Sequence, residues 1–128
     1  MKASKFALPV LLASVVSIAT AGEIKPYSQA QFDTLAAGGK PIVLAVHAPW
    51  CPTCKAQKPI LDALMTRPGF KDVTTLTIDF DTEKALLTHY KVGTQSTLIA
   101  FKGAKEVGRT VGDTTPTGIE GLIKKTVN

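Results

Sequence analysis

A chain of 128 residues with a formal net charge of +5 is long enough for one compact domain and too short for two. Its fifteen Lys and Arg residues are spread along the chain and are not interleaved with aromatic residues, so they predict a solvated basic surface and no nucleic-acid binding. Only two cysteines are present, which excludes a framework of several disulfides.

The N-terminal segment has the pattern of a secretory signal. Two lysines give it a positive start, residues 6–18 are apolar, and an A-x-A cleavage site ends at Ala21. The apolar run is shorter than the about 20 residues that span a membrane, so we expect cleavage after Ala21; an uncleaved anchor is the alternative. The predicted division is therefore a signal peptide at 1–21 and one domain at 22–128, periplasmic or secreted, with no stable membrane span after cleavage.

The first half of the mature domain alternates between strand and helix patterns. Residues 22–27 predict a short edge strand, and Ser28 with a Gln three residues on predicts the N-cap of a helix that stops at Gly38. Residues 42–47 form a continuous apolar run, typical of a strand that is buried on both faces. A second helix should follow, kinked at Pro59.

The second half predicts a strand, a short helix, a hairpin and a final helix. These elements occupy residues 73–80, 82–89, 97–101 paired with 106–111, and 115–127. Asp81 or Thr82 is the expected cap of the short helix. Thr115 is the expected cap of the last helix, with Pro116 at its first position.

Both cysteines lie in one motif between the apolar strand and the second helix, Trp50-Cys51-Pro52-Thr53-Cys54. Two thiols at this spacing can close a small disulfide ring and open it again. Such a short loop removes little entropy from the unfolded chain, so the pair is poorly suited to stabilising a fold. A strand that ends at a C-x-x-C opening a helix is a redox arrangement, and we predict that this pair is a redox centre.

With this motif, Lys55, Pro59 and the segment 92–98, the chain resembles the thioredoxin superfamily over nearly all of its mature length. The resemblance implies an α/β thioredoxin-like fold, with a central mixed β-sheet of four to five strands flanked by helices. It also implies a thiol–disulfide oxidoreductase that exchanges electrons with protein thiols and disulfides and with a redox partner protein. The Cys51–Cys54 disulfide would replace any cofactor, no metal would be needed, and the protein would be a monomer.

The chain departs from the family at three positions. The family has a cis-proline where this chain has Ser96, a buried acid where it has Ala45, and a lysine paired with that acid near Thr75. The acid and its lysine are missing together. These departures indicate a relative of the periplasmic type rather than a cytosolic general reductase.

The two cysteines are expected to have different roles. Cys51, as the N-cap, lies where amide N–H groups and the helix dipole favour a thiolate, so it is the predicted nucleophile. Cys54, one turn further, is the predicted buried resolving thiol. Because Ala45 cannot act as a base, His47 is the candidate base on the same strand face; the alternative is a purely structural hydrogen bond.

Trp50 and the loop that leads into the strand predicted at 97–101 complete the candidate site. Trp50 is expected to shield the disulfide and to belong to the partner-docking surface, or else to be an ordinary core aromatic residue. Gln95, Ser96 and Thr97 form the expected substrate-docking loop. A cis bond before a non-proline residue costs about 2.5–4 kcal/mol, so we expect a trans Gln95–Ser96 bond unless packing enforces cis.

Two rival functions are compatible with the same residues. Cys51, Cys54 and His47 could supply three soft ligands for copper or zinc in a metal-delivery module. The absence of the family's proline keeps that alternative open. A non-catalytic thioredoxin-like binding domain is the other, although it would more often have lost a cysteine.

Overall fold

The computed structural model describes residues 9, 12–14 and 21–128, so most of the predicted signal peptide lies outside the described residues. The helices and strands are, in chain order, β1 (Glu23–Pro26), α1 (Gln29–Ala37), β2 (Pro41–His47), α2 (Pro52–Met65), a 3-10 turn (Pro68–Phe70), β3 (Thr74–Asp79), α3 (Lys84–His89), β4 (Thr97–Lys102), β5 (Lys105–Val111) and α4 (Pro116–Val127). The predicted α/β class is confirmed. In the described part of the chain, no helix has the length and apolar character needed to cross a membrane.

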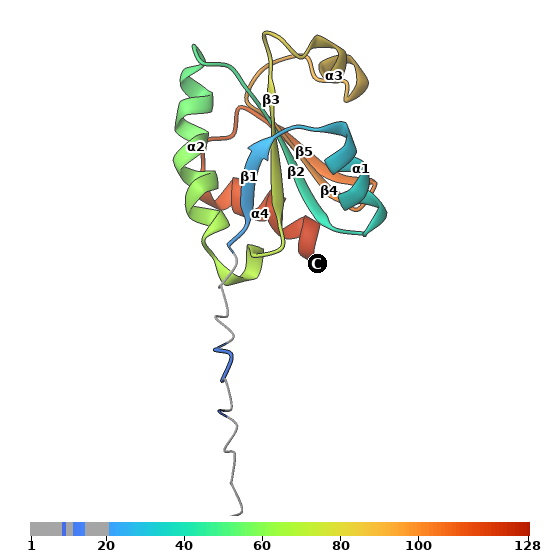
Figure 1. The fold of residues 1–128 in the computed structure, drawn as a ribbon. Helices are drawn as coiled ribbons and strands as arrows, with labels where there is room; N and C mark the ends of the chain where they lie inside the picture. Colours follow the sequence, from blue (N-terminus) through green and yellow to red (C-terminus); the bar gives the residue numbers. More distant parts are fainter. Residues whose placement is uncertain (1–8, 10–11, 15–20) are drawn as a thin grey trace, which may run out of the picture.

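The five strands form one mixed sheet in the order β1-β3-β2-β4-β5 (Figure 1). β1 and β2 both run parallel to β3, whereas β4 pairs antiparallel with β2 and with β5. The predicted edge strand at 22–27 is therefore at an edge, and the predicted hairpin is β4–β5. β2 lies in the middle, and its carboxyl end leads directly into the cysteine motif.

Helices cover both faces of the sheet, which is why β2 is an uninterrupted apolar run. Val43 and Ala45 pack against the core formed with α2 and α4. Ile42, Leu44 and Val46 point to the opposite face and pack in the core beneath α1 and α3. Successive strand residues alternate between faces, so a strand that is covered on both sides has no position for a solvated polar residue.

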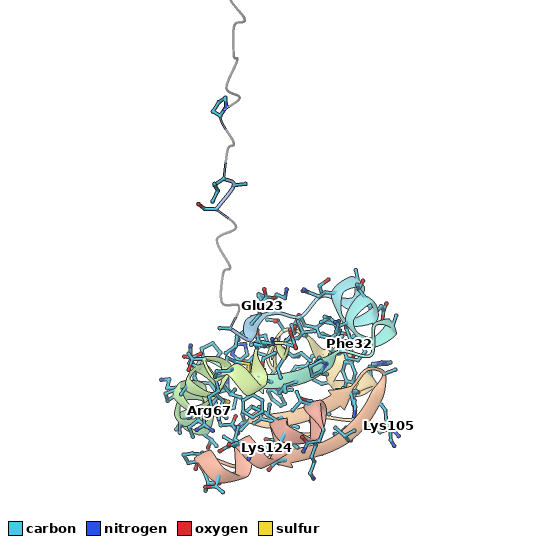
Figure 2. All side chains as sticks on the ribbon, turned by 90° about the horizontal axis from the view of Figure 1, so that it is seen from below. Glu23, Phe32, Arg67, Lys105 and Lys124 are labelled. Carbon is cyan, nitrogen blue, oxygen red and sulfur yellow. A yellow bond between two sulfur atoms is a disulfide. The ribbon has the colours of Figure 1, made fainter. Side chains whose placement is uncertain are left out.

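On the face that α2 and α4 cover, Arg67 and Lys124 lie at the surface of the molecule (Figure 2). Arg67, just after α2, lies 2.7 Å from Glu120, and Lys124 approaches the same carboxylate at 3.4 Å. Arg67 first and Lys124 second hold the pKa of Glu120 below its usual value. Exposed ion pairs of this kind contribute little to stability, so the buried apolar side chains beneath them hold the layers together.

Two predicted helix caps are confirmed and one is wrong. Ser28 accepts from the Gln31 N–H, and Thr115 accepts from the Gly118 N–H. The short helix α3 instead follows Glu83, whose side chain does not cap it, rather than Asp81 or Thr82.

The reason for the misplaced cap is the carboxylate of Asp79 at the end of β3. It accepts the N–H groups of Asp81 at 2.8 Å and Thr82 at 3.1 Å, which holds both residues in a turn before the helix. The Asp81 N–H is the largest cause of the lowered pKa of Asp79. Asp79 therefore holds both expected cap residues in this turn, and the helix begins only after it.

Candidate functional site

Local chain geometry places Cys51 at the N-terminus of α2. It has extended backbone angles, Pro52 follows at the first helical position, and the Cys54 N–H points at the Cys51 sulfur at 3.1 Å. Cys51 and Cys54 form a disulfide with their Cα atoms 5.3 Å apart. The predicted N-cap role of Cys51 is thus confirmed, and the helix remains continuous through Pro59. A sulfur that accepts a backbone N–H at a helix N-terminus is favoured as a thiolate.

Both cysteines are buried, to slightly different extents. Cys51 has no exposed surface, whereas Cys54 keeps 9% of its surface exposed. The prediction that Cys54 is buried is therefore confirmed, and Cys51 is buried as well. Ala48 and Phe80 pack with the disulfide, and Cys54 also lines a pocket beside α2.

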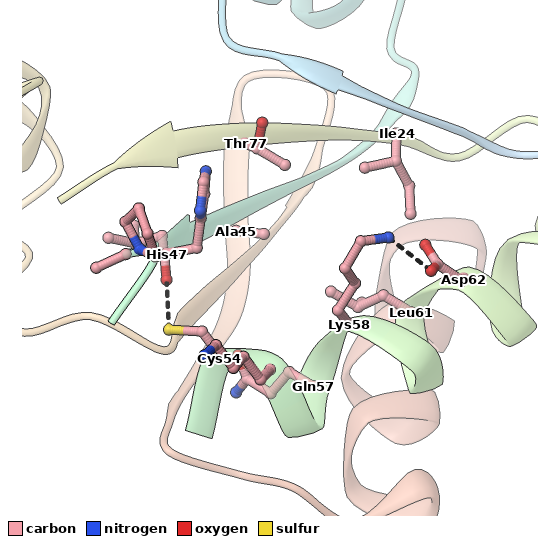
Figure 3. A pocket seen from close by; sticks show the side chains of 13 residues that line it. Ile24, Ala45, His47, Cys54, Gln57, Lys58, Leu61, Asp62 and Thr77 are labelled. Carbon is pink, nitrogen blue, oxygen red and sulfur yellow. Dashed lines mark hydrogen bonds and ion pairs between the residues drawn. The ribbon is translucent and has the colours of Figure 1, made fainter. Parts of the chain in front are cut away.

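A pocket of about 360 Å³ lies between α2 and the strands β1, β2 and β3 (Figure 3). Ala45, His47 and Cys54 line it, so the structure does bring the candidate base and the second cysteine to one cavity. Most of the remaining wall is apolar, and an ion pair between Lys58 and Asp62 at 2.7 Å lies at its border. The small Ala45 side chain leaves space where the family's acid would be.

Ser96 occupies the position where the family has its cis-proline. In the described residues no peptide bond is cis, so the Gln95–Ser96 bond is trans as expected. Ser96 has a φ of +61°, in the left-handed region that favours glycine, and is almost fully buried. Its hydroxyl oxygen lies 3.1 Å from the sulfur of Cys51 and 3.1 Å from the sulfur of Cys54. Sequence reasoning placed Ser96 in the loop but missed this double contact.

Sequence reasoning also missed Gln57, which ties this loop to α2. Its side-chain amide donates to the Ser96 carbonyl at 3.1 Å and to the Asp113 carbonyl at 2.8 Å, and the residue is buried. A signal was present in the sequence. Gln57 lies three residues after Cys54 and four before Leu61, so it interrupts the buried stripe of the helix with a polar side chain.

The other two loop residues have local partners. The Thr97 hydroxyl donates to the Thr94 carbonyl at 2.8 Å, and the Gln95 side-chain oxygen accepts from the Thr94 hydroxyl at 2.9 Å. Neither side chain has a hydrogen bond to a sulfur. Thr97 is the first residue of β4, which fixes the loop against the centre of the sheet.

Trp50 is not a core residue. Its side chain is 55% exposed, and its indole N–H donates to the Asp81 carboxylate at 2.8 Å. The alternative of an ordinary core aromatic is therefore wrong. The hydrogen bond orients an exposed aromatic ring directly before the redox pair. Aromatic side chains are enriched on surfaces that dock other proteins.

The ligand set of the metal alternative does not come together in the part of the chain that the structure describes. Within residues 21–128 there is no group of three or more His, Cys, Asp or Glu side chains that could hold one ion. His47 pairs in register with Asp79 of β3, and the two cysteines are joined to each other.

Comparisons with known proteins agree with this geometry. The thioredoxin family model matches residues 23–125. A thioredoxin of Chlamydia trachomatis is 37% identical over 90 residues, which make up 70% of this chain and 84% of that protein. Thioredoxin-2 of Saccharomyces cerevisiae is 32% identical over 101 residues, covering 78% of this chain and 94% of that protein.

Solved structures give the same result. The crystal structure of Trxlp from Edwardsiella tarda is 39% identical and superposes with a TM-score of 0.75, covering 77% of this chain and 97% of that one. The family model spans most of the chain, and the C-x-x-C pair lies at disulfide distance. The chain therefore belongs to the thioredoxin family, and it is a thiol–disulfide oxidoreductase.

Proposed function

We propose that Cys51 is the attacking sulfur and Cys54 the resolving sulfur of an oxidoreductase that acts on protein disulfides outside the cytosol, as a monomer. This assignment rests on the hydrogen-bonding partners of the two sulfurs, which are a donor for Cys51 and an acceptor for Cys54. Cys51 faces a donor, the Cys54 N–H at 3.1 Å, which favours a thiolate. The Cys54 sulfur lies 4.0 Å from an acceptor, the Val46 carbonyl, which favours a protonated thiol.

The exchange follows from this asymmetry. The Cys51 thiolate attacks one sulfur of a substrate disulfide and forms a mixed disulfide, while the other substrate sulfur leaves as a thiolate with the electron pair of the broken bond. Cys54, after losing its proton, then attacks the Cys51 sulfur and releases the first substrate sulfur as a second thiolate. Two electrons have passed to the substrate, and the Cys51–Cys54 disulfide is restored.

The N-terminal pattern and the start of the folded domain support an extracytoplasmic location. The Gly22 N–H donates to the Met65 carbonyl at 2.8 Å, and a Cβ at Gly22 would lie 2.7 Å from the Phe70 carbonyl oxygen. Packing therefore begins at the residue that follows the predicted cleavage site at Ala21. The short strand β1, which ends at Pro26, offers little backbone for pairing with a second copy at that edge of the sheet.

Expression of the full chain in a Gram-negative bacterium tests the location. We expect the protein in the periplasmic fraction, with the intact mass of a chain whose first residue is Gly22. An Ala21→Arg variant, which removes the small residue that signal processing requires, should keep the N-terminal segment. Unprocessed wild-type protein in the cytosolic fraction would contradict the proposed location and leave the assignment of the cysteines untouched.

His47 is proposed as the base that takes the proton of Cys54, since both line the same pocket. A general base contributes about 10²-fold or more, so His47→Ala should slow resolution of a mixed disulfide by about 10²-fold and leave its formation nearly unchanged. Stopped-flow measurement of the two steps separately, in the wild-type protein and in the variant, tests this expectation. The exposed His89 provides the control, His89→Ala, in which both rates should persist. An unaltered resolution rate in His47→Ala would leave His47 with a structural role only.

A further inference from the structure

A single hydroxyl group bridges the two redox sulfurs. Ser96 Oγ lies 3.1 Å from the sulfur of Cys51 and 3.1 Å from that of Cys54. In residues 21–128 no other side chain has a hydrogen bond to either sulfur; their remaining partners are the Cys54 N–H and the Val46 carbonyl. With only 3% of its surface exposed, Ser96 makes this contact with little competition from water.

The backbone holds this hydroxyl in place against its own preference. Ser96 has a φ of +61°, which glycine adopts without strain and serine does not. Three hydrogen bonds fix it there: its N–H donates to the Val46 carbonyl at 2.8 Å, and its carbonyl accepts from the Gly112 N–H at 3.0 Å and the Gln57 amide at 3.1 Å. A strained conformation that is held on three sides, with its side chain on the reacting atoms, points to a function for that side chain.

We propose that Ser96 is a further catalytic residue, whose hydroxyl donates a hydrogen bond to whichever redox sulfur carries the negative charge. In the reduced protein it donates to the Cys51 thiolate. This inference rests on the proposed roles of the two cysteines. It goes beyond them because it assigns the stabilisation of both thiolates to one side chain, at a position where the family's proline has no donor.

The hydroxyl would serve both steps of the exchange. When Cys51 attacks, its lone pair forms the new S–S bond and its charge disappears, so the Ser96 O–H is free to turn towards Cys54. The Cys54 proton passes to a base, which is His47 in the function proposed above or water. The resulting Cys54 thiolate accepts the Ser96 O–H until its lone pair forms the bond to Cys51 and the substrate sulfur leaves as a thiolate. The serine keeps its proton throughout, so atoms and electrons balance without any change at Ser96.

Two variants separate the hydroxyl from the backbone strain. Ser96→Ala removes the hydroxyl and keeps the strain, whereas Ser96→Gly removes both. In the reduced protein, the pH dependence of iodoacetamide alkylation, followed for each cysteine by mass spectrometry, reports the pKa of Cys51. Loss of a hydrogen bond to a charged sulfur should raise that pKa by about one unit in both variants, a tenfold change in thiolate stability. The disulfide should become less oxidising by up to the same tenfold factor, about 30 mV in reduction potential.

The outcomes distinguish this inference from the function on which it rests. Equal shifts in Ser96→Ala and Ser96→Gly support it, while a shift in Ser96→Ala alone, or in neither, overturns it. Thr126→Ala, a buried hydroxyl deletion in α4 away from the sulfurs, controls for general destabilisation and should leave the Cys51 pKa unchanged. If Cys54 rather than Cys51 is the low-pKa thiol of the wild-type protein, the proposed cysteine roles fail. If the Cys51 pKa is low in the wild-type protein and unchanged in both Ser96 variants, only the proposed role of the hydroxyl is contradicted.

Discussion

Replacing Cys54 by serine should leave the protein covalently joined to its substrates, whereas replacing Cys51 by serine should abolish exchange. In Cys54→Ser the attacking sulfur persists and still accepts an amide N–H at the N-terminus of α2, but no second thiol resolves the mixed disulfide. In Cys51→Ser the remaining thiol faces the Val46 carbonyl, which favours its unreactive protonated form. We expect turnover below about 10⁻³ of wild type in both variants, because each lacks one half of the dithiol.

Non-reducing electrophoresis after acid quenching, followed by mass spectrometry of the trapped species, checks this result. The double variant Cys51→Ser/Cys54→Ser is the matched control and should trap nothing. The burial of the two cysteines makes the experiment decisive, since Cys54 keeps 9% of its surface exposed and Cys51 none. If Cys51→Ser traps partners and Cys54→Ser does not, then access rather than the amide donor selects the attacking sulfur, and the proposed roles are reversed.

Restoring the family's proline at position 96 should destabilise the protein strongly. Proline fixes φ near about −65° and has no N–H, whereas Ser96 has a φ of +61° and donates to the Val46 carbonyl at 2.8 Å. The substitution therefore forces the loop to rebuild and leaves a buried carbonyl without this donor. We expect a loss of about 3 kcal/mol or more in the free energy of unfolding, and a melting temperature lower by about 10 °C or more.

Thermal and urea denaturation of the oxidised protein measure this loss, with Ser96→Gly as the matched control. Glycine removes the same side chain but accepts the positive φ and keeps the N–H, so Ser96→Gly should remain within about 1 kcal/mol of wild type. A stable Ser96→Pro variant would show that the loop can switch its conformation. Disulfide exchange with a peptide substrate should then increase, and unaltered exchange would show that position 96 does not set substrate docking.

Features that depend on neighbouring residues in the chain were predictable. Three helix caps depend only on amides within one helical turn, so residue types at fixed spacing specify them. These caps are Ser28, Thr115 and Cys51, the last followed by Pro52. The uninterrupted apolar run of β2 likewise indicated a strand that is covered on both faces. The cap of α3 was nevertheless mispredicted, although it also depends on neighbouring residues. The Asp79 carboxylate accepts the N–H groups of Asp81 and Thr82, the two residues expected to cap that helix, and holds them in a turn.

Features that depend on packing were less predictable. Trp50 is exposed and donates to the Asp81 carboxylate, which lies 31 residues later in the chain, in the turn before α3. The burial of the disulfide likewise depends on Ala48 and Phe80, which belong to two different segments of the fold. Residue type alone cannot decide such outcomes, since both Trp and Cys occur in buried and in exposed sites.

The order of the elements and the dithiol at the start of α2 could be predicted from the chain alone, because each depends on local spacing and hydrophobic period. The residues that contact the dithiol could not be predicted in this way, because they come from segments that are distant in the chain. Ser96 lies 45 residues after Cys51 and reaches it because the antiparallel pairing of β2 with β4 brings the loop before β4 beside the end of β2. A hydroxyl oxygen 3.1 Å from each of two sulfurs needs that register and a φ of +61°, and no local pattern in the chain specifies either.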